Sequence, residues 1–173
     1  MSPRDTADPV VAQAVDPREE TLRQFGAHGA AVLGFCRAMI ARTGEAEDVV
    51  QETYLKLLVH LEAGGDRANL RAWLFTVAAN ACRDRLNRAR RWLPWPEHLD
   101  LPSMDPPDDA PELGPARLAF RRLKPRDRLL LGLRGQGLSY REIAQAARLG
   151  ETSVGKLLAR AADRWKRAME KHS

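Results

Sequence analysis

The 173-residue chain lacks any long run of hydrophobic residues. No segment approaches the roughly 18 consecutive apolar residues that a membrane-spanning helix needs, so the sequence predicts no membrane insertion. The first residues, MSPRDTADPVVAQAVD, are polar and contain proline, which is not the pattern of a secretory signal peptide. We therefore expect a cytoplasmic protein.

Cysteine and histidine are also scarce, with two and four residues respectively. Cys36 and Cys82 lie within apolar helical patterns, which favours two small buried side chains over a redox pair. The histidines show no metal-ligand spacing, and the chain contains no phosphate-binding loop, dinucleotide fingerprint or nucleophile elbow. The sequence thus predicts no metal, no cofactor and no enzymatic activity.

The alternation of apolar and polar residues that is typical of β-strands persists nowhere, and helical spacing takes its place. In the segment DPREE, Asp16 is the expected N-cap and Pro17 the first helical residue. The sequence predicts an all-α protein, with helices over 17–41, 45–62, 70–92, 117–123 and 125–134, followed by a helix pair within 137–165.

Residues 93–115 interrupt this helical pattern. They hold seven of the eleven prolines and six acidic residues, but no basic residue. Because proline removes a backbone donor and restricts the residue before it, we expect a flexible, acidic, proline-rich linker. It would join two small helical domains, 16–92 and 116–173, with residues 1–15 as a mobile tail.

The helix pair is the clearest local motif. Ser139 and Glu142 have the spacing of a capping box, and a short turn is expected near Leu149 and Gly150. The second helix has a basic outer face, and residues 116–173 carry a net charge of +10. This pattern favours a DNA-binding helix-turn-helix over a solvated helical hairpin. The candidate DNA contacts are Arg141, Ser153, Lys156, Arg160 and Arg164.

The predicted helix 70–92 has one polar face of unusual composition. Thr76, Asn80, Arg83, Asn87 and Arg90 are spaced by four, three, four and three residues, so they share one side of the helix. Amide, hydroxyl and guanidinium groups can contact base edges and phosphates. The composition therefore favours a nucleic-acid contact, although Asn80 could instead bridge helices and Arg83 could be solvated.

The predicted helix 45–62 has a mixed outward face. Its inward side is formed by Ala46, Val50, Thr53, Leu57 and Leu61, which leaves Leu55 and Val59 outside among Asp48, Gln51 and Glu52. Aliphatic side chains among acidic ones indicate either a protein contact or coverage by a neighbouring helix. The residues alone leave both interpretations open.

Three segments together resemble the bacterial sigma factors of the group-four, extracytoplasmic-function (ECF) kind. AEDVVQETYLKLL is similar to region 2.2 of that family, and NLRAWLFTVAANACRDRLNR to regions 2.3 and 2.4. LKPRDRLLLGLRGQGLSYREIAQAARLGETSVGKLLARA is similar to region 4. The resemblance implies a region 2 helical bundle and a region 4 helix-turn-helix, which would read the minus-10 and minus-35 promoter elements.

The resemblance also implies partners: core RNA polymerase, through its β′ clamp helices and β subunit, promoter DNA and an anti-sigma factor. Asp48, Gln51 and Glu52 match the polymerase-binding motif, and we add Leu55 from the same face. The loop GGDRANLR would hold an extruded base, with Asn69 and Arg71 as candidate contacts. Ala79 and Arg148 stand where the family commonly has Arg and Gly, so its promoter preference does not transfer.

Two other functions remain open at this point. A one-component repressor or activator would need the helix-turn-helix, but not the features of residues 45–90. A sigma-like decoy that titrates an anti-sigma factor would lack the polar DNA faces, which are present here.

Overall fold

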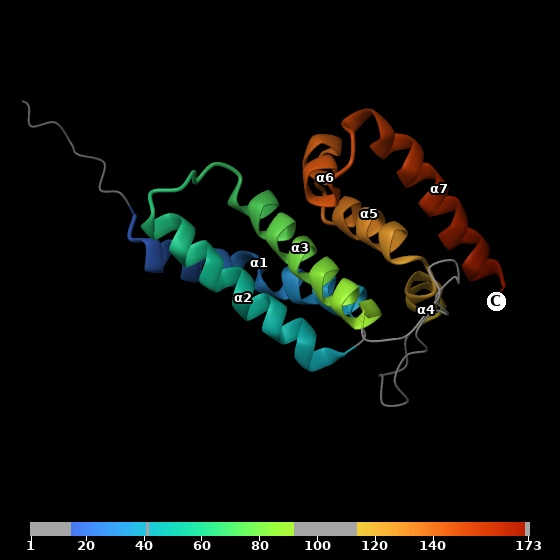
Figure 1. Ribbon diagram of the computed structural model, residues 1–173, viewed down its shortest axis with the longest axis horizontal. Helices are drawn as coiled ribbons and strands as arrows, with labels where there is room; N and C mark the ends of the chain where they lie inside the picture. The colour runs from blue at the N-terminus through green and yellow to red at the C-terminus, as the bar shows by residue number, and fades with distance from the viewer. Residues whose placement is uncertain (1–14, 41, 92–113, 172–173) are drawn as a thin grey trace, which may run out of the picture.

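The computed structural model describes residues 15–40, 42–91 and 114–171. Most of the predicted tail and of the predicted linker lies outside these residues. The described residues form seven α-helices and no strand, which confirms the all-α prediction (Figure 1). The helices are α1 (Pro17–Met39), α2 (Thr43–Glu62), α3 (Leu70–Arg91), α4 (Pro115–Arg121), α5 (Pro125–Gly135), α6 (Tyr140–Ala147) and α7 (Glu151–Glu170).

Two helices begin at the caps that the sequence predicts. The Asp16 side chain accepts a hydrogen bond from the Arg18 backbone N–H at 3.3 Å, and Pro17 occupies the first turn of α1. Ser139 and Glu142 form the predicted capping box of α6. Because these caps satisfy backbone N–H groups that lack a partner inside the helix, they fix where each helix starts.

We call α1–α3 the N-terminal bundle. The three helices pack against one another around Val32, Leu57, Leu74 and Phe75, all of which are fully buried. The predicted inward face of α2 is buried along its whole length, from Ala46 to Leu61. The helical periodicity therefore identified the buried side of α2 correctly.

The two cysteines meet inside the N-terminal bundle. Cys36 of α1 and Cys82 of α3 are buried free thiols, which fits the preferred interpretation of small buried side chains. A hydrogen bond to Cys36, together with burial, raises the pKa of the Cys82 thiol far above its ordinary value. Cys82 therefore stays a neutral thiol in this environment.

We call α4–α7 the C-terminal bundle. Leu130, Leu133, Ile143 and Val154 form its fully buried centre, and α6 and α7 make the predicted helix-turn-helix. Arg148 takes a left-handed conformation in the turn, with φ of 55°. This conformation strains the backbone of any residue that has a Cβ, which explains why glycine is the commoner choice there.

Gly155 also has a structural explanation. A Cβ atom at this position would lie 3.3 Å from Cε2 of Tyr140, so glycine makes room for the Tyr140 ring. The helix nevertheless continues without a break from Glu151 to Glu170. Gly155 therefore serves the packing of α6 against α7.

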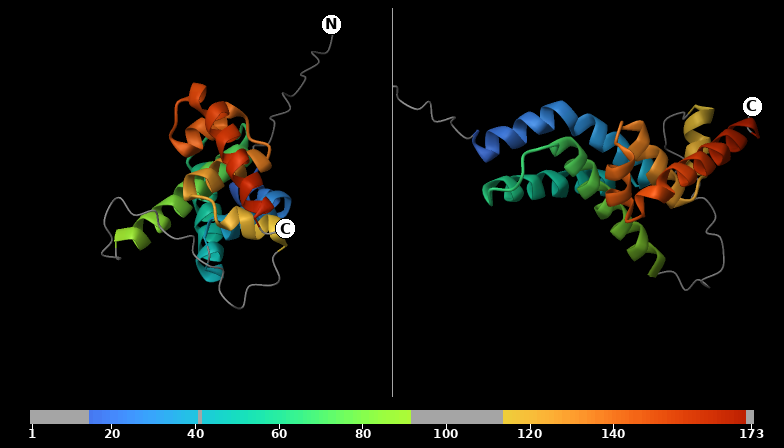
Figure 2. Two further views of the ribbon diagram at one scale, coloured as in Figure 1. Left: turned by 90° about the vertical axis from the view of Figure 1, so that its right-hand side faces the viewer. Right: turned by 90° about the horizontal axis from the view of Figure 1, so that it is seen from above.

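The two bundles pack against each other. Helix α6 lies on α3, and α5 lies on α1, as the views of Figures 1 and 2 agree. The Phe35 ring joins the bundles, because it lies edge-to-face against Phe75 at 5.7 Å between centroids and also covers Gly132 of α5. Buried residues of both bundles form one continuous apolar cluster.

Candidate polymerase and nucleic-acid surfaces

The outward face of α2 is open to solvent. Leu55 and Val59 are 65% and 64% exposed, so no neighbouring helix among the described residues covers them. Together with Asp48, Gln51, Glu52 and Lys56 they line an open hollow of about 420 Å³. The face thus offers apolar surface with acidic groups beside it, which is the composition of a protein-docking site.

Glu52 differs from the other acidic residues of this face because it is already paired. Its carboxylate accepts hydrogen bonds from Lys56 Nζ at 2.7 Å and from Arg85 Nη1 of α3 at 3.2 Å. The hydrogen bond from Lys56 lowers the pKa of the Glu52 carboxyl, and Arg85 adds to this effect. Glu52 therefore also links α2 to α3, whereas Asp48 and Gln51 are exposed.

The N-terminal part of the α3 face is engaged by the C-terminal bundle. The side-chain amide of Asn69 donates to the Glu142 carboxylate, and Arg71 donates to the backbone carbonyl of Gln136. Asn69 also caps α3, because its Oδ1 accepts from the Ala72 N–H at 3.2 Å. Two candidate minus-10 contacts thus bind the α5–α6 region in this arrangement.

The middle of the same face is partly covered. Arg83 donates to the carbonyl of Ala146 at the end of α6, and also to Asn80 Oδ1 at 3.2 Å. Burial lowers the pKa of Arg83, and the nearby Arg148 lowers it further. Thr76 turns its hydroxyl back to the Ala72 carbonyl at 2.8 Å, so this hydroxyl is not presented outward.

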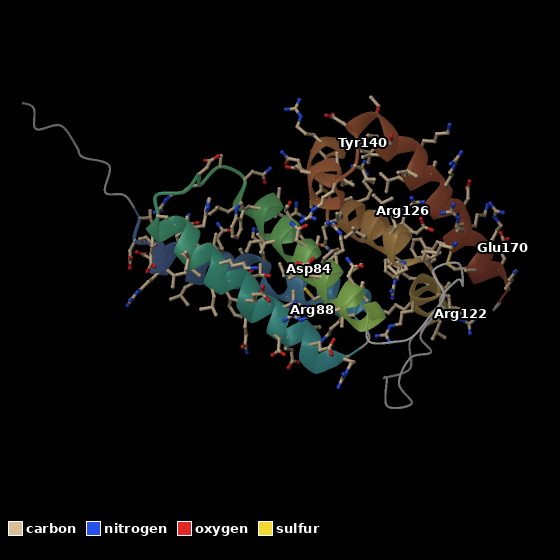
Figure 3. All side chains as sticks on the ribbon, viewed as in Figure 1. Asp84, Arg88, Arg122, Arg126, Tyr140 and Glu170 are labelled. Carbon is tan, nitrogen blue, oxygen red and sulfur yellow. The ribbon has the colours of Figure 1, made fainter. Side chains whose placement is uncertain are left out.

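The C-terminal part of the α3 face is exposed. Asn87 and Arg88 are open to solvent, and Figure 3 labels Asp84 and Arg88 on this part of α3. The end of α3 projects away from the other helices in both views of Figure 2. The side chain of Arg90 lies outside the described residues.

The outer face of α7 is open along its length. Ser153, Lys156 and Arg160 are exposed, and within the described ranges neither Lys156 nor Arg160 forms an ion pair. Arg141 extends this face from α6 and lies 3.8 Å from the Glu151 carboxylate. Ser153, Lys156 and Arg160 thus give the second helix of the motif a polar and cationic outer face.

Arg164 has a structural role that the sequence did not reveal. Its Nη1 donates to Oδ2 of Asp127 at 2.7 Å, and Asp127 is only 2% exposed. Removing the partner of a buried carboxylate is costly, so Arg164 stabilises the contact between α5 and α7. It remains partly exposed and can still reach a phosphate beside the other α7 residues.

The sequence analysis missed the residues that contact the α3 face from the C-terminal bundle. Glu142 was recognised only as a cap, and the carbonyls of Gln136 and Ala146 carry no sequence signal. It also missed His60 and Gly65, which shape the loop before α3. A packed glycine can be found only from coordinates.

The described residues offer neither a metal-binding cluster nor a membrane-spanning helix. No group of three or more His, Cys, Asp or Glu side chains is placed to hold a metal ion. Among the same residues, no helix combines the length and the apolar character that crossing a membrane requires.

Comparisons with known proteins identify similar sequences and folds. Residues 25–92 match the family model described as sigma-70 region 2. The chain is 36% identical over 95 residues to the ECF RNA polymerase sigma factor SigG of Mycobacterium tuberculosis, covering 53% of this chain but only 25% of SigG. It thus spans about a quarter of the length of that relative.

A second relative matches over most of both chains. The ECF RNA polymerase sigma factor SigF of Caulobacter vibrioides is 32% identical over 153 residues, which covers 81% of this chain and 85% of SigF. In structure, the sigma factor RpoE, solved in complex with the anti-sigma factor NepR from Bartonella quintana, superposes with a TM-score of 0.69 at 20% identity. That match covers 88% of this chain and 98% of RpoE.

Proposed function

Because this chain belongs to the ECF sigma factors of RNA polymerase, we propose that it binds core RNA polymerase and directs it to promoters. The N-terminal bundle reads the minus-10 element and the C-terminal bundle reads the minus-35 element. The protein acts in the cytoplasm as a transcription initiation factor and catalyses no reaction of its own.

The exposed face of α2 carries this proposal. Leu55 and Val59 contribute nothing to the core, yet they lie side by side among acidic and amide groups. Burying one leucine side chain contributes about 1.5–3 kcal/mol, enough for a central contact of an interface. In the proposed complex Leu55 enters an apolar pocket of the polymerase, and Asp48 and Gln51 contact polar groups around it.

The minus-10 surface needs a change of arrangement before it can act. Asn69, Arg71 and Arg83 donate to groups of the C-terminal bundle, so these donors are occupied while that bundle lies on α3. Each of these hydrogen bonds contributes about 1 kcal/mol net, and DNA acceptors would replace the lost partners. We call the observed packing of the C-terminal bundle on α1 and α3 the closed arrangement. We infer that this arrangement is the DNA-free one and that docking on polymerase separates the bundles.

The minus-35 surface needs no such change. Ser153, Lys156 and Arg160 already face solvent on a helix of the size that enters a major groove. Ser153 can read a base edge, whereas Lys156 and Arg160 reach phosphates or guanine. Arg141 and Arg164 lie at the margins of this surface, and each pairs with an acidic residue of the same chain, the exposed Glu151 and the buried Asp127 respectively.

An anti-sigma factor is the expected regulatory partner. The structurally similar RpoE was solved with such a protein, and the closed arrangement offers a binding partner a surface that spans both bundles. A protein that holds the bundles together would keep Asn69, Arg71 and Arg83 away from DNA.

The test of the proposed function is docking on polymerase. Leu55→Asp combined with Gln51→Ala should reduce co-purification with core polymerase at least about tenfold, because a charge replaces the leucine that the proposed complex would bury. Promoter-specific transcription in a reconstituted assay should fall in parallel. Leu22→Asp is the matched control, since Leu22 of α1 is 72% exposed and lies outside the proposed interface.

The opposite result has a clear meaning. If the unmutated protein gives no promoter-specific initiation with core polymerase, yet binds a duplex site tightly by itself, it acts as a one-component DNA-binding regulator. The helix-turn-helix alone would then account for its function.

A further inference from the structure

We propose that His60 is a positioning residue for the loop between α2 and α3, and that Gly65 is required because the His60 ring occupies the place of its Cβ. Through this contact the loop holds Asn69 so that its amide presents N–H donors to a hydrogen-bond acceptor of promoter DNA. This inference rests on the proposed function for the identity of the ligand.

The end of α2 places His60 and Gly65 against each other. The Gly65 N–H donates to the His60 carbonyl at 2.8 Å, and the Gly64 N–H donates to the Leu61 carbonyl at 3.1 Å. Gly64 has φ of 74°, so these bonds form the Schellman motif that reverses the chain after a helix. The motif brings His60, in the last turn of α2, next to Gly65, the third residue after Glu62.

The His60 ring is held on three sides. Its Nε2 lies 2.9 Å from the Asp66 carbonyl oxygen, and since a carbonyl only accepts, Nε2 carries the proton. The ring stacks on Trp73 of α3 with 4.9 Å between centroids. A Cβ atom on Gly65 would lie 2.3 Å from the His60 Cε1, which is closer than any real contact.

The contact with the His60 ring is the only reason why residue 65 has to be glycine. Unlike Gly64, its φ lies outside the left-handed region, so an alanine there suffers no backbone strain. The obstacle to a methyl group is the His60 ring, and that ring cannot easily move because Trp73 and Asp66 hold it. The two positions should therefore be energetically coupled.

The loop that His60 holds ends at Asn69. Asp66 accepts from the Ala68 N–H at 2.8 Å, which leads the chain into Asn69 with φ of 52°. Asn69 Oδ1 is occupied by the Ala72 N–H, so the side-chain amide has only its Nδ2 hydrogens left to offer. In the closed arrangement Glu142 accepts from Nδ2, and in the open one an acceptor on a base edge or phosphate would take that place.

The first experiment measures the loop in the free protein. Backbone amide exchange of residues 66–69 should become faster in His60→Ala and in Gly65→Ala. The double variant should exchange no faster than His60→Ala alone, because without the ring the added methyl group finds space. Gly44→Ala is the control, since a Cβ at Gly44 meets no atom within 4 Å. Additive effects of the two substitutions would overturn the positioning role.

The second experiment measures promoter discrimination by reconstituted transcription from a library with a randomised minus-10 element. His60→Ala and Gly65→Ala should each lower the preference at the same minus-10 position by up to about tenfold, as the loss of one base contact does. Asn69→Asp should affect that position too, because aspartate keeps the cap but lacks the donor. Co-purification with polymerase should stay unchanged.

The outcomes of the two experiments distinguish a failure of the positioning role of His60 from a failure of the proposed function. A uniform fall of activity on all minus-10 sequences would show that His60 only stabilises the fold, and this would overturn the inference. Absence of promoter-specific initiation by the unmutated protein would overturn the proposed function and the DNA role of Asn69. The coupling in amide exchange would still decide whether His60 positions the loop.

Discussion

The polar face of α3 and the cationic face of α7 carry side chains of similar chemistry, yet they differ in access. Lys156 and Arg160 of α7 face solvent, whereas Asn69, Arg71 and Arg83 of α3 donate hydrogen bonds to the C-terminal bundle. The cationic face of α7 is thus available at once, whereas these three donors of the α3 face are occupied until the bundles separate. The arrangement favours an order of events in which polymerase docking precedes minus-10 recognition.

The bundles also differ in what stabilises them. The N-terminal bundle buries aromatic and aliphatic side chains from three long helices, including the Phe35–Phe75 pair. Three of the four helices of the C-terminal bundle are shorter, and its buried carboxylate, Asp127, pairs with Arg164 of another helix. The buried carboxylate of the N-terminal bundle, Glu20, pairs instead with Arg23 of the same helix. A small core has less apolar burial to draw on, so a single polar contact weighs more in its stability.

The largest expected effect tests how much the Asp127–Arg164 pair stabilises the C-terminal bundle. Arg164→Ala should lower the free energy of unfolding of the C-terminal bundle by about 3 kcal/mol, because Asp127 would stay buried without its partner. Arg160→Ala, one turn earlier on α7, should change it by less than about 0.5 kcal/mol. Thermal unfolding followed by circular dichroism measures both, and binding to a minus-35 duplex should weaken in both variants.

A double variant makes this prediction sharper. Adding Asp127→Asn to Arg164→Ala removes the unpaired charge and should recover part of the lost stability. Equal unfolding free energies for Arg164→Ala and Arg160→Ala would mean that the ion pair contributes nothing.

An intermediate effect is expected at the junction of the bundles. A Cβ atom on Gly132 would lie 3.1 Å from Phe35 Cε2, so Gly132→Ala should push the C-terminal bundle away from α1. If overpacking costs about 1 kcal/mol, binding of single-stranded minus-10 DNA by the free protein should increase about fivefold. Small-angle scattering should show a larger radius of gyration.

Gly135→Ala provides the matched control for this junction. It lies on the same helix, and a Cβ there meets no atom within 4 Å, so it changes helix propensity without pressing on α1. Unchanged scattering and unchanged DNA binding in Gly132→Ala would mean that the closed arrangement does not limit access to α3.

The smallest effect concerns the pH dependence of the α6 cap, whose Glu142 also accepts from Asn69. Hydrogen bonds from the Ser139 N–H, the Ser139 hydroxyl and Asn69 lower the pKa of the Glu142 carboxyl. Because the folded-state pKa is depressed, this stabilisation is present above the ordinary glutamate value of about 4.3 and is lost as the pH falls below it. The loss should be at most about 1 kcal/mol, as for other helix caps.

Glu142→Gln should remove this part of the pH response, and Glu151→Gln on α7 serves as the control. Amide exchange of α6, measured between about pH 3 and 6, reports the change. Identical pH profiles for the native protein and Glu142→Gln would contradict the assignment.

Local rules in the sequence were sufficient for the helices and their buried sides. Asp16 and the Ser139–Glu142 box set helix starts, and the spacing of Ala46, Leu57 and Leu61 identified the inward side of α2. These features depend on residues within a few positions of one another, because capping bonds and helical faces repeat within one or two turns. For the same reason Leu55 and Val59 could be predicted to face outward.

Tertiary structure alone decided which polar side chains face water. Asn69 and Glu142 are 73 residues apart, Arg83 and Ala146 are 63 apart, and Asp127 and Arg164 are 37 apart. Helical periodicity separates apolar from polar sides, but it carries no information on whether a polar side meets solvent or a carbonyl of another helix. That choice depends on how the two bundles pack, and the packing is set by apolar contacts such as Phe35 against Gly132, which join residues distant in the chain.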